Sequence, residues 1–304
     1  MKNLKFLFLP FVGLIMAVNL GSCNKDDEPG SENAGNGIIN VDGARLTGIN
    51  GYGEIQYDSE GRVKSASDGY ESMEFNYSNG QFVWEDETGN FKFNNQGYIT
   101  ELSASWNESG DGYSYKGSGV AKFSYDSAGH IVKFSITSSE IEKEDGETYT
   151  YEESSNITYT WKEGNLISSS EKYVSKEDGE TENYYTDTAI TYSSEINKFQ
   201  QFPYGLAEVL LMDGPTSLLA AAGVFGKGMQ NFPKSILIDE DGYSWKENYN
   251  YDLNSNGSIN REEADGIFFT YQYTPFDTRS VINIYGNEKR KGLRSLFIRN
   301  ETKK

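Results

Sequence analysis

The chain is poor in the residues that build disulfides and metal centres, with one cysteine and one histidine in 304 residues. One cysteine excludes an intrachain disulfide, and one histidine excludes a metal site made of several imidazoles. Long apolar runs are also scarce. The main one, from Phe6 to about Val18, is shorter than the roughly 20 residues that a membrane-spanning helix needs. The sequence therefore predicts no membrane-spanning helix.

Positive charge is scarce as well, with 27 Lys and Arg against 46 Asp and Glu and a formal net charge of −19. A negative field of that size repels phosphate backbones and anionic membrane surfaces. We therefore expect no nucleic-acid partner, and we expect the folded body to stand away from the lipid surface.

The first 22 residues have the organisation of a bacterial export signal. Lys2 and Lys5 precede the apolar run, and Leu20-Gly21-Ser22-Cys23 follows it, a small-residue cleavage site that ends in cysteine. Signal peptidases of lipoproteins cut before such a cysteine, whose sulfur then carries lipid. The sequence predicts cleavage of residues 1–22 and attachment to a membrane through lipid on Cys23.

The predicted mature chain begins with a polar segment, residues 23–40. Its Lys25, Asp26, Asp27 and Glu28 resemble the surface-export signal of Bacteroidetes lipoproteins. The segment carries glycines and no apolar period, which is typical of a flexible tether. The resemblance implies an outer-membrane lipoprotein that is exposed at the cell surface.

From residue 50 onward, apolar and polar residues alternate between short polar turns that contain glycine. Tyr57 leads into Asp58-Ser59-Glu60-Gly61, and Tyr125 leads into Asp126-Ser127-Ala128-Gly129. Period-two alternation puts apolar side chains on one face of a strand, and glycine permits the positive φ of a tight turn. Successive hairpins predict an all-β antiparallel meander, curved into a barrel-like domain.

The hexamer Lys-Glu-Asp-Gly-Glu-Thr occurs twice, at residues 143–148 and 176–181. Asp-Gly is a strong hairpin-turn signal. We expect solvated turn tips here, with a cation or partner site as the alternative. The two predicted long hairpins pair 134–143 with 147–161 and 166–176 with 180–192. Later strands are expected at 235–238, 244–251, 267–273, 281–285 and 293–299.

One segment, residues 204–224, departs from this alternation. Residues 204–212 and 216–224 are dense in Leu and Ala at helical spacing, and Asp213-Gly214-Pro215 separates them. The pattern predicts two short helices, the second beginning at a Thr216 cap. Both are apolar nearly all round, so we expect them to fill the mouth or interior of the curved sheet.

Several motifs occur together along residues 45–300. They are the two Tyr-Asp-Ser-x-Gly hairpins, Pro203-Tyr204-Gly205-Leu206, Phe225-Gly226-Lys227-Gly228, Asn231-Phe232-Pro233-Lys234 and a Tyr-x-Tyr-Asp hairpin at 249–257. With the lipidation site, they resemble a Bacteroidetes lipoprotein family of unknown function with a porin-like fold, DUF4595. The resemblance implies a β-barrel without assigned catalytic residues. Porin-like then describes shape only, because charged outer faces cannot lie in hydrocarbon.

A possible calcium loop runs from residue 252 to 263. The spacing fits the EF-hand pattern, with oxygen ligands, a glycine at the sixth position and a glutamate at the twelfth. The candidate ligands are Asp252, Asn254, Asn256, Ser258 and Glu263. The flanking residues alternate like strands rather than helices, so a plain hairpin and a calcium site both stay open.

Candidate catalytic residues are few. His130 beside a turn glycine is expected to be an exposed turn residue, and no spacing among the acidic residues favours a catalytic pair. The four tryptophans are expected in the buried stripes of the hairpins, except Trp106, whose polar surroundings favour exposure and contact with a sugar ring. The basic group Lys289-Arg290-Lys291, with Arg294 and Arg299, is expected to pair with acidic turns or to dock a partner.

These observations predict a signal peptide, a lipidated tether and one β-rich domain over residues 41–304. The expected function is non-enzymatic, as a surface-anchored binding or scaffold lipoprotein for a glycan or another envelope protein. The alternatives are a calcium-supported glycan-binding protein and a carbohydrate-active hydrolase. No cofactor is expected apart from calcium in the alternative reading.

Overall fold

The structure is a computed structural model that describes residues 38–84, 87–110, 112–144, 147–211 and 214–275. The predicted signal peptide, Cys23, the last two predicted strands and the basic group at 289–299 lie outside the described residues. Within them the barrel begins at Ala44 and ends at Pro275. The last residues of the predicted tether already contact it, since Ile38 packs against the core and the Ile39 amide donates to the Ala222 carbonyl.

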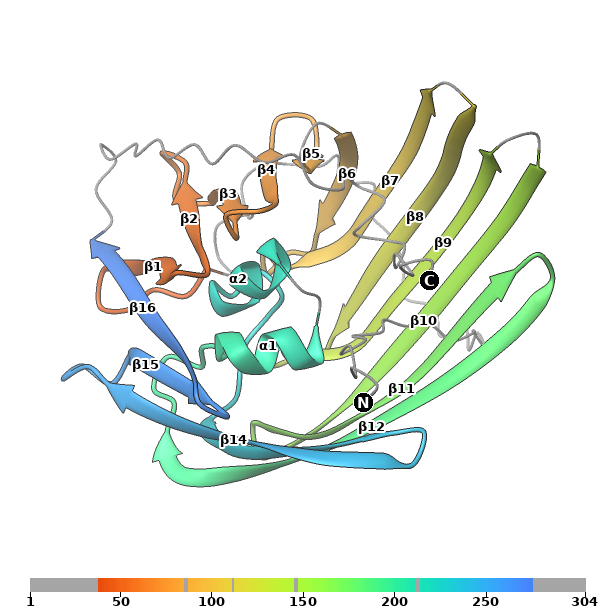
Figure 1. The fold of residues 1–304 in the computed structure, drawn as a ribbon. Helices are drawn as coiled ribbons and strands as arrows, with labels where there is room; N and C mark the ends of the chain where they lie inside the picture. The colour runs from red at the N-terminus through yellow and green to blue at the C-terminus, as the bar shows by residue number, and fades with distance from the viewer. Residues whose placement is uncertain (1–37, 85–86, 111, 145–146, 212–213, 276–304) are drawn as a thin grey trace.

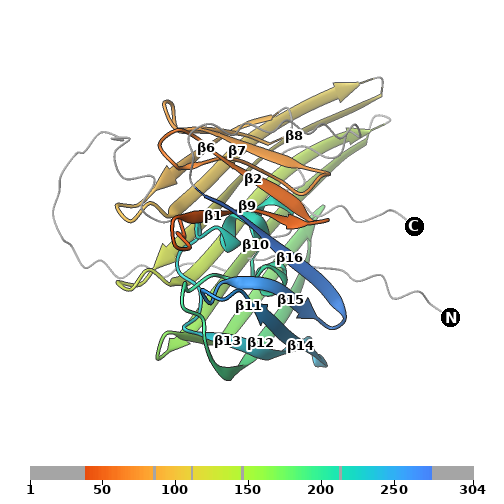
Figure 2. The same cartoon turned by 90° about the vertical axis from the view of Figure 1, so that its left-hand side faces the viewer.

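Sixteen strands form one closed antiparallel barrel, in which each strand pairs with its sequence neighbours and β1 closes the ring with β16 (Figures 1 and 2). The first half comprises β1 (Ala44–Asn50), β2 (Gly53–Tyr57), β3 (Val63–Ser67), β4 (Ser72–Asn76), β5 (Gln81–Trp84), β6 (Glu87–Phe93), β7 (Ile99–Gly110) and β8 (Tyr113–Tyr125). The second half comprises β9 (Ile131–Glu144), β10 (Glu147–Lys162), β11 (Asn165–Glu177), β12 (Glu180–Ile196), β13 (Asn231–Glu240), β14 (Tyr243–Leu253), β15 (Ile259–Ala264) and β16 (Ile267–Pro275). The predicted all-β meander and its closure are confirmed.

Four turns at one end of the barrel, here called the base end, share one geometry. In each, the first residue accepts a backbone hydrogen bond from the glycine three positions later, and its own amide donates to the carbonyl four positions later. These turns start at Asp58, Asn94, Asp126 and Asn254. The repeated Asp/Asn-x-x-Gly signal in the sequence therefore corresponds to a repeated turn.

Turns at the opposite end, here called the tip end, are tied to a neighbouring strand. In three of them an aspartate with φ of +44° to +48° precedes a glycine that also has positive φ. Each aspartate donates its amide to the carbonyl of a residue on the preceding strand, and its Oδ1 accepts the amide of that same residue. The three pairs are Asp178 with Thr150, Asp241 with Tyr185, and Asp265 with Asn248.

The barrel wall is uneven because strand length differs around the ring. Strands β2 to β5 have 4 or 5 residues, whereas β8 to β12 have 13 to 17. The long hairpins extend well past the short strands at the tip end (Figure 1). The two predicted long hairpins are confirmed, each within a few residues of its expected bounds.

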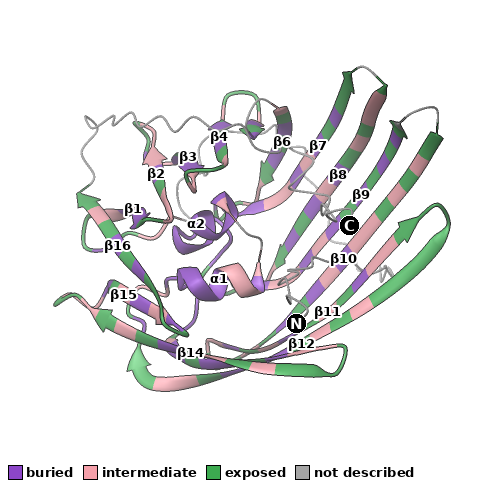
Figure 3. Cartoon of the chain, in the orientation of Figure 1, coloured by how far each residue is buried: buried purple, intermediate pink, exposed green. Residues whose placement is uncertain are grey.

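Two short helices, α1 (Tyr204–Leu210) and α2 (Pro215–Ala221), connect β12 to β13 from inside the barrel. Nearly all their residues are buried (Figure 3). Helix α2 packs on β2 where Gly53 has φ of +152°, and a Cβ there would lie 2.5 Å from Leu218 Cδ1. The helices fill the barrel interior beside β1, β2, β3 and β15, and their predicted burial is confirmed. We call this filled part of the interior the floor.

The predicted Thr216 cap is wrong. Helix α2 begins one residue earlier, at Pro215, with Gly214 at the cap position and no side-chain cap. Proline at the first helical position is pre-set for helical φ and needs no amide partner, so it starts the helix itself. Neither helix in the described residues is long and apolar enough to cross a membrane.

Candidate functional site: an aromatic and acidic lumen wall

Above the floor, the long strands line the lumen with a different kind of side chain. Phe123, Ile136, Ile157 and Ile190 face the core next to the helices. No register shift interrupts β8, β9, β11 or the described pairs of β12 between these positions and the tips. Every second residue toward the tips therefore faces the lumen as well.

These inward positions are occupied by tyrosine, tryptophan, glutamate and serine. We call this surface the lumen wall. It includes Trp106 and Glu108 on β7, Tyr113 and Tyr115 on β8, Ser138, Glu140 and Glu142 on β9, Tyr149, Tyr151, Glu153 and Ser155 on β10, Glu171, Tyr173, Ser175 and Glu177 on β11, and Glu182 and Tyr184 on β12.

The inner face of this wall carries charge of one sign, whereas the outer face carries both. The alternation that turns the glutamates inward turns every lysine of β7 to β12 outward, and these strands contain no arginine. The outward lysines are Lys116, Lys122, Lys133, Lys143, Lys162, Lys172 and Lys176. Among the described residues of these six strands, the inner face thus carries carboxylates and no side-chain cation.

A tryptophan reaches across a glycine to anchor one of the carboxylates. Trp106 pairs with Gly117 on β8, and Gly117 pairs with Glu140 on β9. The Trp106 indole Nε1 donates to Glu140 Oε2 at 2.7 Å, and both side chains are almost fully buried. A Cβ on Gly117 would lie 2.5 Å from the indole ring, so only glycine leaves room for this contact.

The same pairing of an aromatic donor with a carboxylate recurs around the interior. The Tyr113 hydroxyl donates to Glu108 at 3.1 Å, and the Tyr184 hydroxyl donates to Glu182. Tyr113 also lies against Tyr115 with ring centroids 5.4 Å apart. The wall is therefore a network in which phenol and indole donors hold carboxylates in place.

Tyr151 shows how negative this environment is. Burial raises the pKa of the Tyr151 phenol well above its usual value, and the nearby charges of Glu142 and Glu177 raise it further. Glu142 itself is 6 % exposed and accepts a hydrogen bond from Tyr151. A phenolate is thus strongly disfavoured here, because the surrounding carboxylates repel a further negative charge.

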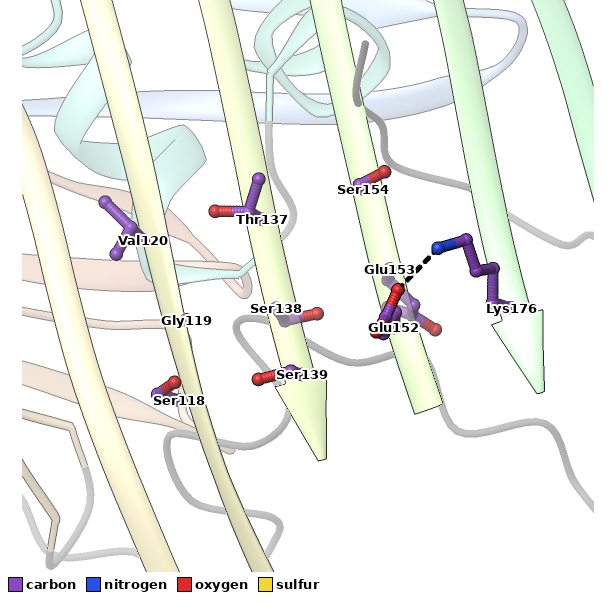
Figure 4. Close-up of a pocket in the computed structure, with 10 residues that line it drawn as sticks. All are labelled: Ser118, Gly119, Val120, Thr137, Ser138, Ser139, Glu152, Glu153, Ser154 and Lys176. Atoms are coloured by element: carbon purple, nitrogen blue, oxygen red, sulfur yellow. Dashed lines mark hydrogen bonds and ion pairs between the residues drawn. The ribbon is translucent and has the colours of Figure 1, made fainter. Parts of the chain in front are cut away.

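A small pocket of about 290 Å³ lies in the wall between β9 and β10 (Figure 4). The hydrogen-bonded pairs of these strands run from Glu147↔Glu144 to Thr150↔Ile141, and the pocket lies beyond them toward the floor. Inward residues Gly119, Ser138 and Glu153 line it together with outward ones. At its outer mouth, Lys176 Nζ contacts Glu152 Oε2 at 2.7 Å.

Two buried hydroxyls on the lumen wall have no hydrogen-bond partner in the described structure. They are the Oγ atoms of Ser138 and Ser155, whose residues are 7 % and 0 % exposed. Buried hydroxyls normally find a partner, and one left alone costs about 1–3 kcal/mol. Both lie at the lower, floor-side edge of the lumen wall.

Two expectations about single residues are wrong. Trp106 is 4 % exposed, because its polar neighbours in sequence face outward and the Glu140 contact draws the indole inward. His130 is 7 % exposed rather than open to solvent. Its Nδ1 lies 3.1 Å from Asp126 Oδ2, and its ring stacks on Trp161 with centroids 4.3 Å apart.

The candidate calcium residues lie on the β14–β15 hairpin. Asn254, Asn256 and Ser258 come together in the turn, where they hydrogen-bond to one another. Asp252 and Glu263 lie on the two strands, and Asp252 has Arg261 Nη1 at 3.8 Å. The flanks are strands, and the turn has the same backbone geometry as the other three base turns. Calcium binding here stays a prediction.

The adjacent Glu262 faces the other way and supports the floor. It is fully buried, and its Oε2 accepts from the Tyr271 hydroxyl at 2.7 Å and from the Gly205 amide at 3.2 Å. Burial raises the pKa of this carboxyl to about 7. Glu262 was not predicted from the sequence, because the calcium pattern there points to the adjacent Glu263.

Comparison with known proteins adds fold-level likenesses. No protein-family model and no curated protein matches the chain. A porin-like protein from Bacteroides vulgatus has 14% identity and a TM-score of 0.46, over 73% of this chain and 92% of that one. A porin-like protein from Bacteroides uniformis has 13% identity and a TM-score of 0.27, over 64% and 90%. Membership of the DUF4595 family stays a prediction.

The lumen wall itself was not predicted from the sequence. Its signal was present as same-face repeats, Tyr-x-Tyr at 113–115 and 149–151 and Glu-x-Glu at 140–142. Alternation shows that such residues share a face. It does not show whether polar aromatics and acids belong to the inner or the outer face, and the apolar rule favours the outer face for glutamate.

Proposed function

We propose that this protein is a non-enzymatic, lipid-anchored lipoprotein of the outer membrane that binds its ligand in the lumen above the floor. The observation that carries the proposal is the lumen wall, where aromatic rings and carboxylates of β7 to β12 share the inner face of the barrel beyond the part filled by α1 and α2. Ligand sites typically combine apolar and aromatic surface with a few convergent polar groups.

The outer face supports a barrel that stands in water. Outward positions of β8 to β11 carry mainly Ser, Thr, Lys, Glu and Asn, with exposed apolar side chains such as Ile141 and Ile167 scattered singly. Barrels that span membranes instead carry an apolar band outside and a polar interior. A lipid on Cys23 would then hold the barrel at the membrane, as the export signal predicts.

Two ligand classes follow from the sequence, a glycan and a segment of another envelope protein. Rings such as Tyr115 and Tyr173 can stack on sugars, and carboxylates such as Glu153 can accept hydrogen bonds from sugar hydroxyls. The same groups can also receive side chains of a protein.

A binding screen with the full chain tests the proposal. The lipidated protein in detergent is exposed to a glycan array and to a library of short peptides. We expect a ligand whose binding is lost in Tyr151→Ala and retained in Tyr185→Ala, an exposed tyrosine on an outward position. Equal loss in both variants would contradict a site in the lumen, and turnover of a bound glycan would contradict a non-enzymatic role.

The anchor is tested separately in cells. Cys23→Ser is expected to release the protein from the envelope fraction, because the lipid-bearing sulfur is gone. Unchanged fractionation of this variant would show that Cys23 is not the anchor.

A further inference from the structure

We infer that the lumen ligand is a cationic, extended peptide segment of a partner protein, with Lys or Arg at alternate positions. This inference rests on the proposed function and specifies which of its ligand classes the wall recognises. It follows from the charge, the spacing and the unpartnered hydroxyls of the lumen wall.

The charge of the inner face favours a cation. Glu108, Glu140, Glu142, Glu153 and Glu182 face the lumen, and no lysine or arginine of β7 to β12 does. Low-dielectric walls of one sign concentrate the field in the space between them. A neutral sugar gains little from such a field, whereas an ammonium or guanidinium group is strongly attracted by it.

Aromatic rings add a second contribution that is specific to cations. Tyr115 on β8 pairs with Glu108 on β7 and with Glu142 on β9. On the other side of β9, Glu142 pairs with Tyr149 on β10. A cation placed between a ring face and a carboxylate gains from both.

The spacing of these groups matches an extended chain. Glu140 and Glu142 are two residues apart on one strand, which separates inward side chains by about 7 Å. Alternate side chains of an extended peptide have the same separation. A segment that lies along β9 and β10 can therefore place successive cations over successive carboxylates, which a compact amine cannot.

The unpartnered hydroxyls mark where such a segment would be hydrogen-bonded. Ser138 Oγ and Ser155 Oγ are buried, face the lumen and have no hydrogen-bond partner among the residues that the structure describes. Ser138 also lines the pocket between β9 and β10. Glu153 and Gly119, which has no side chain, are the other inward residues of that pocket. A peptide amide or a lysine ammonium in the lumen can satisfy these oxygens.

Adjacent glutamates on opposite faces of β10 give a matched test. The full-length protein is titrated with a fluorescent peptide of about twelve residues with alternating Lys and Ser, and with its Glu-Ser counterpart. We expect Glu153→Gln, on the inner face, to weaken Lys-Ser binding by about 5- to 10-fold. Glu152→Gln, on the outer face, should change it less than about 2-fold. Circular dichroism and thermal unfolding confirm that both variants are folded, and Glu142→Gln replaces Glu153→Gln if the latter is not.

Three further readouts complete the test. Raising salt from 50 to 500 mM should weaken binding at least about tenfold. Equal effects of Glu152→Gln and Glu153→Gln, or equal binding of the Glu-Ser peptide, would overturn the inference. Glycan binding that depends on Glu153, without peptide binding, would overturn the cationic class and leave the proposed function intact, whereas failure of every probe would overturn both.

The chain's own basic residues are a competing occupant that the same titration reveals. Lys289, Arg290 and Lys291 lie outside the described residues and are replaced together by glutamine in the full chain. Tighter Lys-Ser binding by this variant would support a lumen selective for cations in which the chain itself competes. Unchanged binding with the Glu153 dependence intact supports an external partner alone.

Discussion

The two halves of the barrel interior are built by the same alternation and filled in opposite ways. Around the short strands, α1 and α2 fill the lumen and the inward residues are mainly apolar, such as Ile49, Val63 and Phe269. Along the long strands beyond the floor, the inward residues are tyrosine and glutamate. A closed sheet thus has a dry core only where another element fills it, and elsewhere its inner face can carry function.

The two halves should differ most in how much stability the protein loses when an inward side chain is truncated to alanine. Leu219→Ala, in fully buried α2, is expected to lower the free energy of unfolding by about 3–4 kcal/mol, because it leaves a cavity in the floor. Tyr113→Ala on the half-buried lumen wall should cost less than about 1 kcal/mol. Urea denaturation of both variants measures the contrast, and equal losses would show that the upper wall is packed like the floor.

The floor should also respond to pH through Glu262. Its pKa is about 7 in the folded protein and near 4.5 when exposed, so the folded state holds a proton that the unfolded state has lost between these values. Stability should therefore fall as pH rises from about 4.5 through 7, by about 3 kcal/mol in all.

Glu262→Gln is expected to remove that fall and to stabilise the protein most above pH 7. Thermal unfolding from pH 4 to 8.5 measures it, with Glu263→Gln on the outer side of the same strand as the control. An identical pH dependence in the wild-type protein and the Glu262→Gln variant would show that Glu262 is not the responsible group.

A pair of tryptophans sharpens the comparison between the halves. Trp106 in the long-strand wall donates to Glu140, whereas Trp84 on β5 is buried and its Nε1 has no partner within the described part of the chain. Trp106→Phe should therefore cost about 1–2 kcal/mol more than Trp84→Phe, because it also removes a hydrogen bond to a buried carboxylate. Chemical denaturation compares the two. A larger loss in Trp84→Phe would mean that ring packing, not the hydrogen bond, dominates at Trp106.

The smallest expected effect concerns the β14–β15 turn. Its geometry matches three base turns that lack the later acidic position, so we expect 1 mM calcium to raise the melting temperature by less than about 1 °C. A rise of several degrees that disappears in Glu263→Gln, but not in Glu262→Gln, would establish a calcium site there.

How far the sequence predicts this molecule depends on which physical signal each element uses. The Asp-Gly turns and their flanking alternation specified β9 to β12 to within four residues at each end, because turn chemistry and period two are local. The two helices were recognisable from Leu and Ala at helical spacing. The start of α2 at Pro215 was missed, because the sequence Gly214-Pro215-Thr216 is compatible both with a helix that begins at proline and with one that is capped by threonine.

What the sequence could not specify is contact between strands. Trp106, Gly117 and Glu140 lie on three strands, and only register brings them together. A tryptophan among polar neighbours then looks exposed although it is buried. The same holds for His130, whose burial comes from Trp161, thirty-one positions away along the chain.

The ties between tip aspartates and the preceding strands have a consequence for how the rim behaves. Each of these aspartates extends the inter-strand hydrogen bonding by one residue pair, beyond the last paired residues of its hairpin. The amides of Thr150, Tyr185 and Asn248 are therefore hydrogen-bonded although they lie beside solvent. Because these backbone groups are already hydrogen-bonded, they are not free to pair with a strand of another molecule at these three positions. Local unfolding of one hairpin there must also break its hydrogen bonds to the neighbouring hairpin. Deuterium should therefore enter these three amides slowly, and at similar rates.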